Sequence, residues 1–217
     1  MPIFECSSCN ELTYSSASDA AGACARCGDR RHRVVEGDFR AARISGRALS
    51  IGDHAALVHD DPARIAPFCA RFLTEGIDAG QRVIAAVDDG VRGAVAPLLA
   101  RDAELVVEWE DPRSIYGDFD PDRVVSMYEA MIAGESRTTR ILAGIDAESA
   151  ATIAEGQLDR YERLAHAVVT KRGATVVCLY DRSAMPEALI EVAHRRHTLS
   201  IEDGDVRRNE RFEFAPA

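Results

Sequence analysis

The sequence predicts an α/β protein with a mostly parallel sheet, helices on both faces of that sheet, and a small zinc ribbon before it. Short apolar runs alternate with amphipathic helical stretches along most of the chain. The apolar runs are nearly continuous rather than alternating with polar residues, as in strands buried on both faces of a parallel sheet. Two Cys-x-x-Cys motifs near the N-terminus indicate the zinc module.

We expect three parts along the chain: a zinc ribbon over residues 1–35, a linker over residues 36–50, and an α/β domain over residues 51–215. The linker contains two glycines and has no clear hydrophobic period. The α/β domain is long enough to bury a sizeable core.

The cysteines of the ribbon have the spacing of a four-thiolate zinc site. The two pairs are separated by 14 residues, so each pair supplies two sulfurs and the segment between them folds back as a hairpin. Bound metal supplies the folding free energy of so small a segment. Two disulfides or a redox motif are the alternatives, although redox motifs rarely occur as a matched pair. The predicted ligands of a structural Zn²⁺ are Cys6, Cys9, Cys24 and Cys27.

Five apolar runs predict the strands of the sheet. They are Ala55–His59, Arg82–Val87, Leu105–Trp109, Arg140–Ile145 and Thr175–Tyr180. The segment Leu199–Phe214, with Asp203-Gly204-Asp205 in its middle, predicts a short hairpin at an edge of the sheet.

Apolar residues repeating at intervals of three and four predict helices between these strands. The clearest repeats lie in residues 65–73, 124–132 and 158–168. Asp61-Pro62 and Asp120-Pro121 each place a capping acid before a proline at the first helical position.

The net charge of −10 is unevenly distributed and limits the partners. Residues 26–47 hold seven arginines and three acids, a local charge of +4, whereas the rest of the chain is acidic. An acidic body repels nucleic acid and acidic membranes, so any contact with a polyanion falls to this arginine-rich segment. The candidate nucleic-acid contacts are Arg30, Arg31 and Arg33.

The sequence favours a cytoplasmic protein. No apolar run approaches the roughly 20 residues of a membrane span, and the first residues lack the pattern of a signal peptide. Cys69 and Cys178 fall inside apolar stretches, where they are most simply buried free thiols in a reducing compartment.

Acids follow every predicted strand, and they define one candidate site. Ligands of open α/β sheets bind at the carboxyl ends of the strands, so Asp88 and Asp181 would line a pocket together with His59 and Trp109. The alternative is that these acids cap the helices that follow them.

The histidines and Cys178 give weaker signals. His54 and His59 are five residues apart on one strand and so point to opposite faces, which makes them a poor metal pair. His194 and His197 have a spacing that can hold a metal, but Arg195 and Arg196 beside them favour a solvated basic helix end. Cys178 either packs in the core or points its thiol into a ligand cavity.

Two common catalytic motifs are absent from the sequence. No Gly-x-x-x-x-Gly-Lys-Ser/Thr follows a strand, and the sole lysine, Lys171, lies at the end of a predicted helix. The nucleophile motif Gly-x-Ser-x-Gly is absent as well. The sequence therefore argues against NTP hydrolysis by the usual P-loop route.

Several blocks of sequence resemble the MEDS domain, the methanogen/methylotroph sensory domain first described in a dichloromethane-responsive repressor. The first is Ile51-Gly-Asp-His54 with its apolar strand, followed by the helix over residues 68–80 and the strand over residues 81–87. The last is Val177-Cys-Leu-Tyr-Asp-Arg-Ser183, and the middle is weak apart from Tyr128-Glu129. The match covers about residues 48–215.

The resemblance implies a relative of RecA-like ATPases that has lost the phosphate loop and senses a small molecule, and the absent P-loop motif agrees. Members of the family often occur beside DNA-binding helices or in signalling proteins, whereas this chain carries a cysteine ribbon in that place.

The leading hypothesis is a non-catalytic regulatory protein that binds a small organic molecule and signals through the ribbon to a protein partner or DNA. The predicted ligand contacts are His54, His59, Asp88, Trp109, Cys178 and Asp181. The alternatives are a nucleic-acid-binding transcription regulator and a metal-dependent hydrolase that uses the strand-end carboxylates. A homodimer is compatible with each of these.

Overall fold

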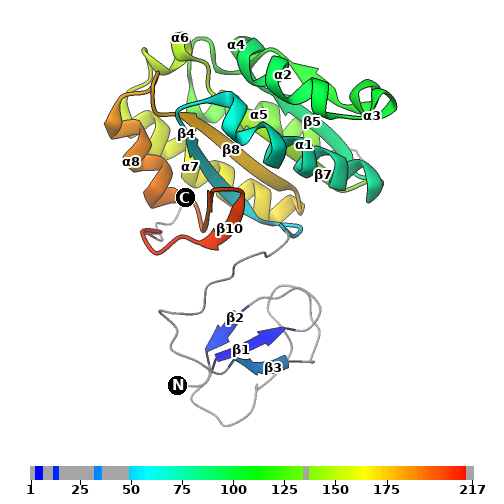
Figure 1. Ribbon diagram of the computed structural model, residues 1–217. Coiled ribbons are helices and arrows are strands. Elements are labelled where there is room, and N and C mark those ends of the chain that lie inside the picture. The colour runs from blue at the N-terminus through cyan, green and yellow to red at the C-terminus, as the bar shows by residue number, and fades with distance from the viewer. Residues whose placement is uncertain (1–2, 7–11, 15–31, 36–48, 134–136, 214–217) are drawn as a thin grey trace. The chain divides into compact units, whose positions relative to one another are not determined.

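The computed structural model describes residues 3–6, 12–14, 32–35, 49–133 and 137–213 (Figure 1). The chain divides into two compact units, Met1–Arg43 and Ile44–Ala217. Within the described residues, no helix is both long enough and apolar enough to cross a membrane.

The N-terminal unit contains a small antiparallel sheet. Strand β1 (Ile3–Cys6) lies between β2 (Leu12–Tyr14) and β3 (His32–Val35).

Most of the predicted ribbon and linker lies outside the described residues. Cys6 ends β1 and Arg33 lies in β3, whereas Cys9, Cys24, Cys27, Arg30 and Arg31 lie outside, as do residues 36–48 of the predicted linker. The four-thiolate zinc site and the arginine contacts therefore stay predictions.

The C-terminal unit is built on a seven-stranded sheet in the order β10-β9-β4-β8-β7-β5-β6 (Figure 1). Every neighbouring pair is parallel except β9 with β10, which confirms the predicted mostly parallel α/β fold. The strands are β4 (His54–His59), β5 (Arg82–Ala86), β6 (Glu108–Glu110), β7 (Thr139–Gly144), β8 (Thr175–Asp181), β9 (Leu199–Glu202) and β10 (Asp205–Arg208).

Helices cover both faces of this sheet, as predicted. One core cluster joins the sheet to α1 (Pro62–Asp78) and α2 (Asp89–Val95). The short helices η1 (Ala96–Leu98) and α3 (Arg101–Val106) follow α2 in the chain. The second cluster joins the opposite face to α4 (Pro112–Tyr116), α5 (Pro121–Ile132), α6 (Ala147–Ala150), α7 (Glu155–Arg172) and α8 (Glu187–Arg196).

The predicted helix starts and the C-terminal hairpin are confirmed. The Asp61 carboxylate accepts a hydrogen bond from the Ala63 amide at the start of α1, and Asp120 does the same for Arg123 at the start of α5. The hairpin turns at Asp203 and Gly204, which both have positive φ, as two-residue hairpin turns of type I′ require.

One predicted strand is wrong in its first half. Strand β6 begins only at Glu108, and the preceding Leu105 and Val106 end helix α3 with exposed side chains. The apolar residues here belong to the surface of a short helix, so apolar content alone did not identify a buried strand.

Candidate functional site

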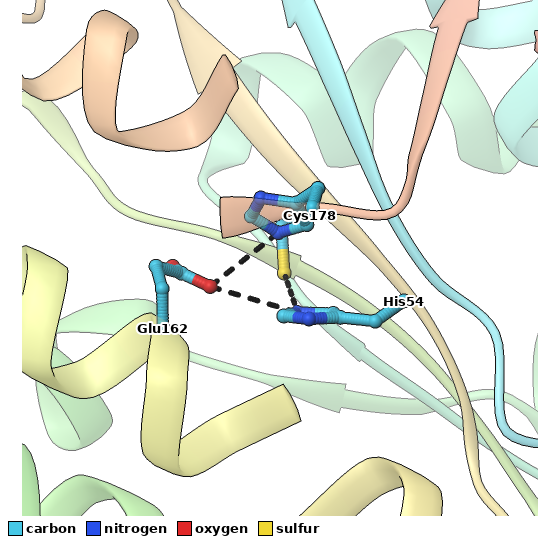
Figure 2. Close-up of side chains that lie close together, drawn as sticks. His54, Glu162 and Cys178 are labelled. Atoms are coloured by element: carbon cyan, nitrogen blue, oxygen red, sulfur yellow. Dashed lines mark hydrogen bonds and ion pairs between the residues drawn. The ribbon is translucent and has the colours of Figure 1, made fainter. Parts of the chain in front are cut away.

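Four side chains from separate elements converge on the face of the sheet that α7 and α8 cover. His54 opens β4, Cys178 lies in the middle of β8, Glu162 lies on α7, and His197 follows the last residue of α8. Figure 2 shows His54, Glu162 and Cys178 pointing toward one another. We call His54, Glu162, Cys178 and His197 the buried cluster.

The register of the sheet explains how the first two meet. Strands β4 and β8 are parallel neighbours, and Ala56 pairs with Cys178 while His54 pairs with Val176. Because side chains alternate along a strand, His54 and Cys178 share one face two positions apart along the pair. Glu162 reaches the same point because it lies between Leu158 and Ala165 on the inner side of α7.

The ligand-type atoms of the buried cluster lie within 4.8 Å of one another. His54 Nε2 lies 3.3 Å from Cys178 Sγ and 3.6 Å from Glu162 Oε2. His197 Nε2 lies 3.4 Å from the same Glu162 oxygen. All four residues are buried, and His197 and Glu162 have no exposed surface.

Neighbouring groups fix the orientation of two cluster side chains. The Nδ1 of His197 lies 2.9 Å from the Ala193 carbonyl oxygen, and because a carbonyl only accepts, this nitrogen carries the proton. The Nε2 of His197 therefore presents a lone pair to the cluster. The Tyr180 hydroxyl donates to Glu162 Oε1 at 2.6 Å, which leaves Oε2 facing inward.

Several buried polar atoms here have no hydrogen-bond partner among the described residues. They are His54 Nδ1, Glu162 Oε2, His197 Nε2 and, on the neighbouring His166, Nδ1. Unpaired buried polar atoms are uncommon in folded proteins and call for a physical explanation.

Burial pushes each member of the cluster toward its neutral form. It lowers the pKa of His197 to about 3 and the pKa of His54 well below its ordinary value, with the charges of His197 and His166 adding to the effect on His54. Burial likewise raises the pKa of Glu162 to about 8 and that of the Cys178 thiol well above its ordinary value. Burial therefore disfavours the charged form of each of the four side chains.

A small cavity adjoins the cluster between the sheet and helices α5 and α7. Its volume is ≈ 20 Å³, and His54 contributes to its wall. The other lining residues are mostly aliphatic: Val125, Tyr128, Ile132, Ile141, Ala143, Tyr161, Ala165, Val168, Val169 and Val176. The hydroxyl of Tyr116 lies 2.8 Å from that of Tyr128 and 3.4 Å from that of Tyr161. The cavity is therefore apolar, with a few polar groups at its edge.

The residues that the sequence predicted as ligand contacts fall in three places. His54 and Cys178 meet in the buried cluster. His59 and Asp181 are paired at the carboxyl ends of β4 and β8. Burial lowers the pKa of His59 there, against the opposing charges of Asp181 and Asp88.

Trp109 lies apart from both groups. It is on edge strand β6, three strands from β8, and the Arg92 guanidinium lies 5.1 Å from the centre of its ring.

The strand-end acids are engaged by nearby backbone amides. Asp88 accepts from Val91 at the start of α2, and Asp146 accepts from Ser149 at the start of α6. Asp181 accepts from the amide and hydroxyl of Ser183. Local capping therefore accounts for these carboxylates.

Sequence reasoning missed Glu162 and misplaced His197. The expectation of a solvated helix end at His197 is wrong, because the chain turns from α8 directly into β9 and carries this side chain into the interior. The sequence could have identified Glu162, because it is an acid on the otherwise apolar helix face formed by Leu158, Tyr161 and Ala165.

Comparison with known proteins finds one matching family model and similar solved structures. The family model described as MEDS, "MEthanogen/methylotroph, DcmR Sensory domain", matches residues 53–198. The solved structure of the RadB recombinase is similar with a TM-score of 0.48 and 16% identity, over 71% of this chain and 76% of that chain. No curated protein matches the sequence.

Proposed function

Because this chain belongs to the MEDS family of sensory domains, we propose that it is a regulatory protein whose α/β unit binds a small organic molecule in the cavity beside His54. The observation that carries the proposal is the cavity itself, an apolar space lined by residues of α5, α7 and the sheet, with His54 of the buried cluster in its wall. Ligand sites are typically apolar spaces with a few placed polar groups.

The size of the cavity limits the ligand. Its ≈ 20 Å³ has room for about one water molecule, whereas an engineered cavity of about 150 Å³ binds benzene. A molecule of about two or three heavy atoms fits after small shifts of the lining side chains. The apolar lining disfavours water, which needs two or more polar partners.

His54 supplies a polar contact for such a ligand. Its Nδ1 has no partner among the described residues, although the side chain is buried. A hydrogen-bonding atom of the ligand would satisfy this nitrogen, while the aliphatic wall accepts the rest of the molecule.

We propose binding rather than catalysis at this site. Cys178, whose thiol contacts His54, is buried and its pKa is raised by burial, whereas nucleophilic cysteines have lowered pKa values and partial exposure. The free, buried Cys69 and Cys178 also fit a cytoplasmic location.

The N-terminal unit is the proposed output of the sensor. We propose that its cysteines hold a structural zinc ribbon that passes the signal to a regulatory protein or to DNA. The arginine-rich segment, with Arg30, Arg31 and Arg33, favours DNA as a second candidate partner because it is the basic part of an acidic chain.

A thermal-shift screen of the full chain tests the ligand-binding proposal. The panel contains alcohols, amines, amides and halogenated hydrocarbons of two or three heavy atoms. A ligand at ten times its Kd stabilises the folded state by about 1.4 kcal/mol, which raises the Tm by roughly 3–6 °C.

A pair of substitutions on α7 assigns any response to the cavity. Ala165→Leu fills the cavity, whereas Ala167→Leu adds the same group to the exposed side of the same helix. We expect Ala165→Leu to lose the response and Ala167→Leu to keep it. Equal responses from both variants would place the ligand elsewhere.

A further inference from the structure

The spacing of the buried cluster matches the edges of a coordination tetrahedron. With zinc bonds of about 2.0–2.3 Å, neighbouring ligand atoms of a tetrahedral site lie about 3.3–3.6 Å apart. The separations of 3.3, 3.4 and 3.6 Å that join His54, Cys178, Glu162 and His197 fall in this range. The remaining pairs lie within 4.8 Å, so small side-chain movements complete the tetrahedron.

A hydrogen-bonded network explains the same contacts less well. Hydrogen bonds between nitrogen and oxygen have heavy-atom distances of about 2.7–3.2 Å. The two contacts of Glu162 Oε2, to His197 at 3.4 Å and to His54 at 3.6 Å, are longer. They leave the buried Glu162 Oε2 and His197 Nε2 without hydrogen-bond partners among the described residues. An ion between these atoms would satisfy both.

The outer contacts also have the form of a metal site. Histidines that bind metals usually donate their other ring N–H to a carbonyl or carboxylate, and His197 donates its Nδ1 proton to Ala193. Carboxylate ligands are in turn hydrogen-bonded, as Glu162 is by the Tyr180 hydroxyl.

The charges balance for a divalent ion. Two neutral imidazoles, one thiolate and one carboxylate around a divalent cation give a site of zero net charge. A neutral site is what a fully buried location tolerates, because an uncompensated charge there is costly.

From these observations we propose that His54, Glu162, Cys178 and His197 bind a divalent transition-metal ion, with Zn²⁺ as the best match. The mixed nitrogen, sulfur and oxygen donors suit zinc, whereas calcium and magnesium prefer oxygen alone. Four protein ligands close the site and give it a structural role, joining α7 and the end of α8 to strands β4 and β8. This ion is separate from the one predicted for the N-terminal cysteines.

The proposed metal site does not depend on the proposed ligand. The cavity could fail to bind any organic molecule while the cluster binds zinc, and the reverse also holds. The two sites share His54, so zinc fixes one wall of the cavity when both proposals hold.

Metal content of full-length variants tests the proposal. Wild type, Cys178→Ala, Cys69→Ala and Glu162→Gln are stripped with a chelator, reloaded with Zn²⁺, and analysed for bound zinc per chain. Cys69 is the matched control, because it is a buried free cysteine in the core of the other sheet face. We expect Cys178→Ala and Glu162→Gln to hold one zinc ion fewer than wild type, and Cys69→Ala to hold the same number as wild type.

Cobalt spectra distinguish metal bound by the buried cluster from metal bound by the N-terminal cysteines. In a full chain with Cys6, Cys9, Cys24 and Cys27 changed to serine, the remaining thiols are Cys69 and Cys178. Added Co²⁺ should give a thiolate charge-transfer band that disappears with Cys178→Ala and persists with Cys69→Ala. Circular dichroism confirms that each variant is folded. Equal zinc content in Cys69→Ala and Cys178→Ala, or no cobalt–thiolate band, would overturn the proposal.

Discussion

The Nε2 of His54 lies 3.3 Å from the sulfur of Cys178, although the residues are 124 positions apart in the chain. The parallel pairing of β4 with β8 creates this contact, and Glu162 and His197 complete it from α7 and the end of α8. His54 and Cys178, from the first and last sequence blocks that resemble the MEDS domain, therefore meet at one buried point.

Tyr180→Phe should weaken both folding and metal binding. It removes the hydroxyl that donates to Glu162 Oε1 at 2.6 Å, which costs about 1–3 kcal/mol for a buried acceptor. Loss of such an outer contact typically lowers metal affinity by about 10–100-fold. Urea denaturation and zinc titration against a competing chelator measure the two effects.

Tyr128→Phe is the matched control for this prediction. Its hydroxyl is also buried, but it bonds to the Tyr116 hydroxyl rather than to the cluster. We expect a loss of stability with unchanged zinc affinity. A similar fall in zinc affinity for both variants would remove the special role of Tyr180.

A pair of glycine substitutions tests the packing of α1 against the sheet. A Cβ on Gly76 would lie 2.8 Å from Arg140 Cδ and 2.9 Å from Val83 Cγ2, so Gly76→Ala should destabilise the fold by about 1–3 kcal/mol through overpacking. A Cβ on Gly156 meets nothing within 4 Å, so Gly156→Ala in α7 should stabilise the fold by about 0.5–1 kcal/mol. Denaturant unfolding of the two variants checks the opposite signs.

Stability should fall in acid partly through Glu108. The Arg82 guanidinium donates to both Glu108 carboxylate oxygens, at 2.9 and 2.6 Å, and these bonds lower the pKa of Glu108 against the opposing effect of burial. A lowered folded-state pKa means that the contribution is present above the unfolded pKa and is lost as the pH falls through the folded value. Because the Glu108 side chain is 41% exposed, its contribution to the free energy of unfolding is less than about 1 kcal/mol.

Unfolding free energies between pH 6 and about pH 3 check this prediction. Glu108→Gln should flatten the acid-side decline, and Glu104→Gln, at an exposed position of α3, should leave it unchanged. Parallel declines for wild type and Glu108→Gln would refute the assignment.

The Cys69 thiol should resist alkylation in the folded protein. Burial raises its pKa to about 12, and its side chain has no exposed surface, so thiolate is scarce at pH 8 and access is blocked. In the chain with the four N-terminal cysteines changed to serine, a thiol reagent should label Cys69 only after denaturant is added. Native labelling at the rate of an exposed thiol would contradict the burial of α1 against the sheet.

The fold was largely predictable because its signals are local. Apolar runs located β4, β5, β7 and β8, and Asp-Pro pairs located the starts of α1 and α5. The predicted strand at β6 began too early, because Leu105 and Val106 are apolar but lie exposed on a short helix. Apolar composition alone does not distinguish such a helix from a buried strand.

The site was only half predictable because its geometry depends on tertiary contacts. His54 and Cys178 lie in the sequence blocks that resemble the MEDS domain, so both could be selected from the sequence. The order of the strands cannot be read from the sequence, so Trp109 was predicted to share a site with residues of β8, which lies three strands away. Arg195 and Arg196 precede His197 and predicted an exposed position for it. His197 is buried because the chain turns there from α8 into β9.

The central claim is that a small organic ligand binds beside His54 rather than at the carboxyl ends of the strands. Nitrogen-15 spectra of the full chain with labelled histidines, recorded with and without a ligand found in the thermal-shift screen, test it most directly. His54 and His59 lie at opposite ends of β4 and on opposite faces of the sheet. We expect the ligand to shift the ring signals of His54 and to leave those of His59 unchanged. A shift of His59 with His54 unchanged would contradict it and would place the ligand among Asp88, Asp181 and His59.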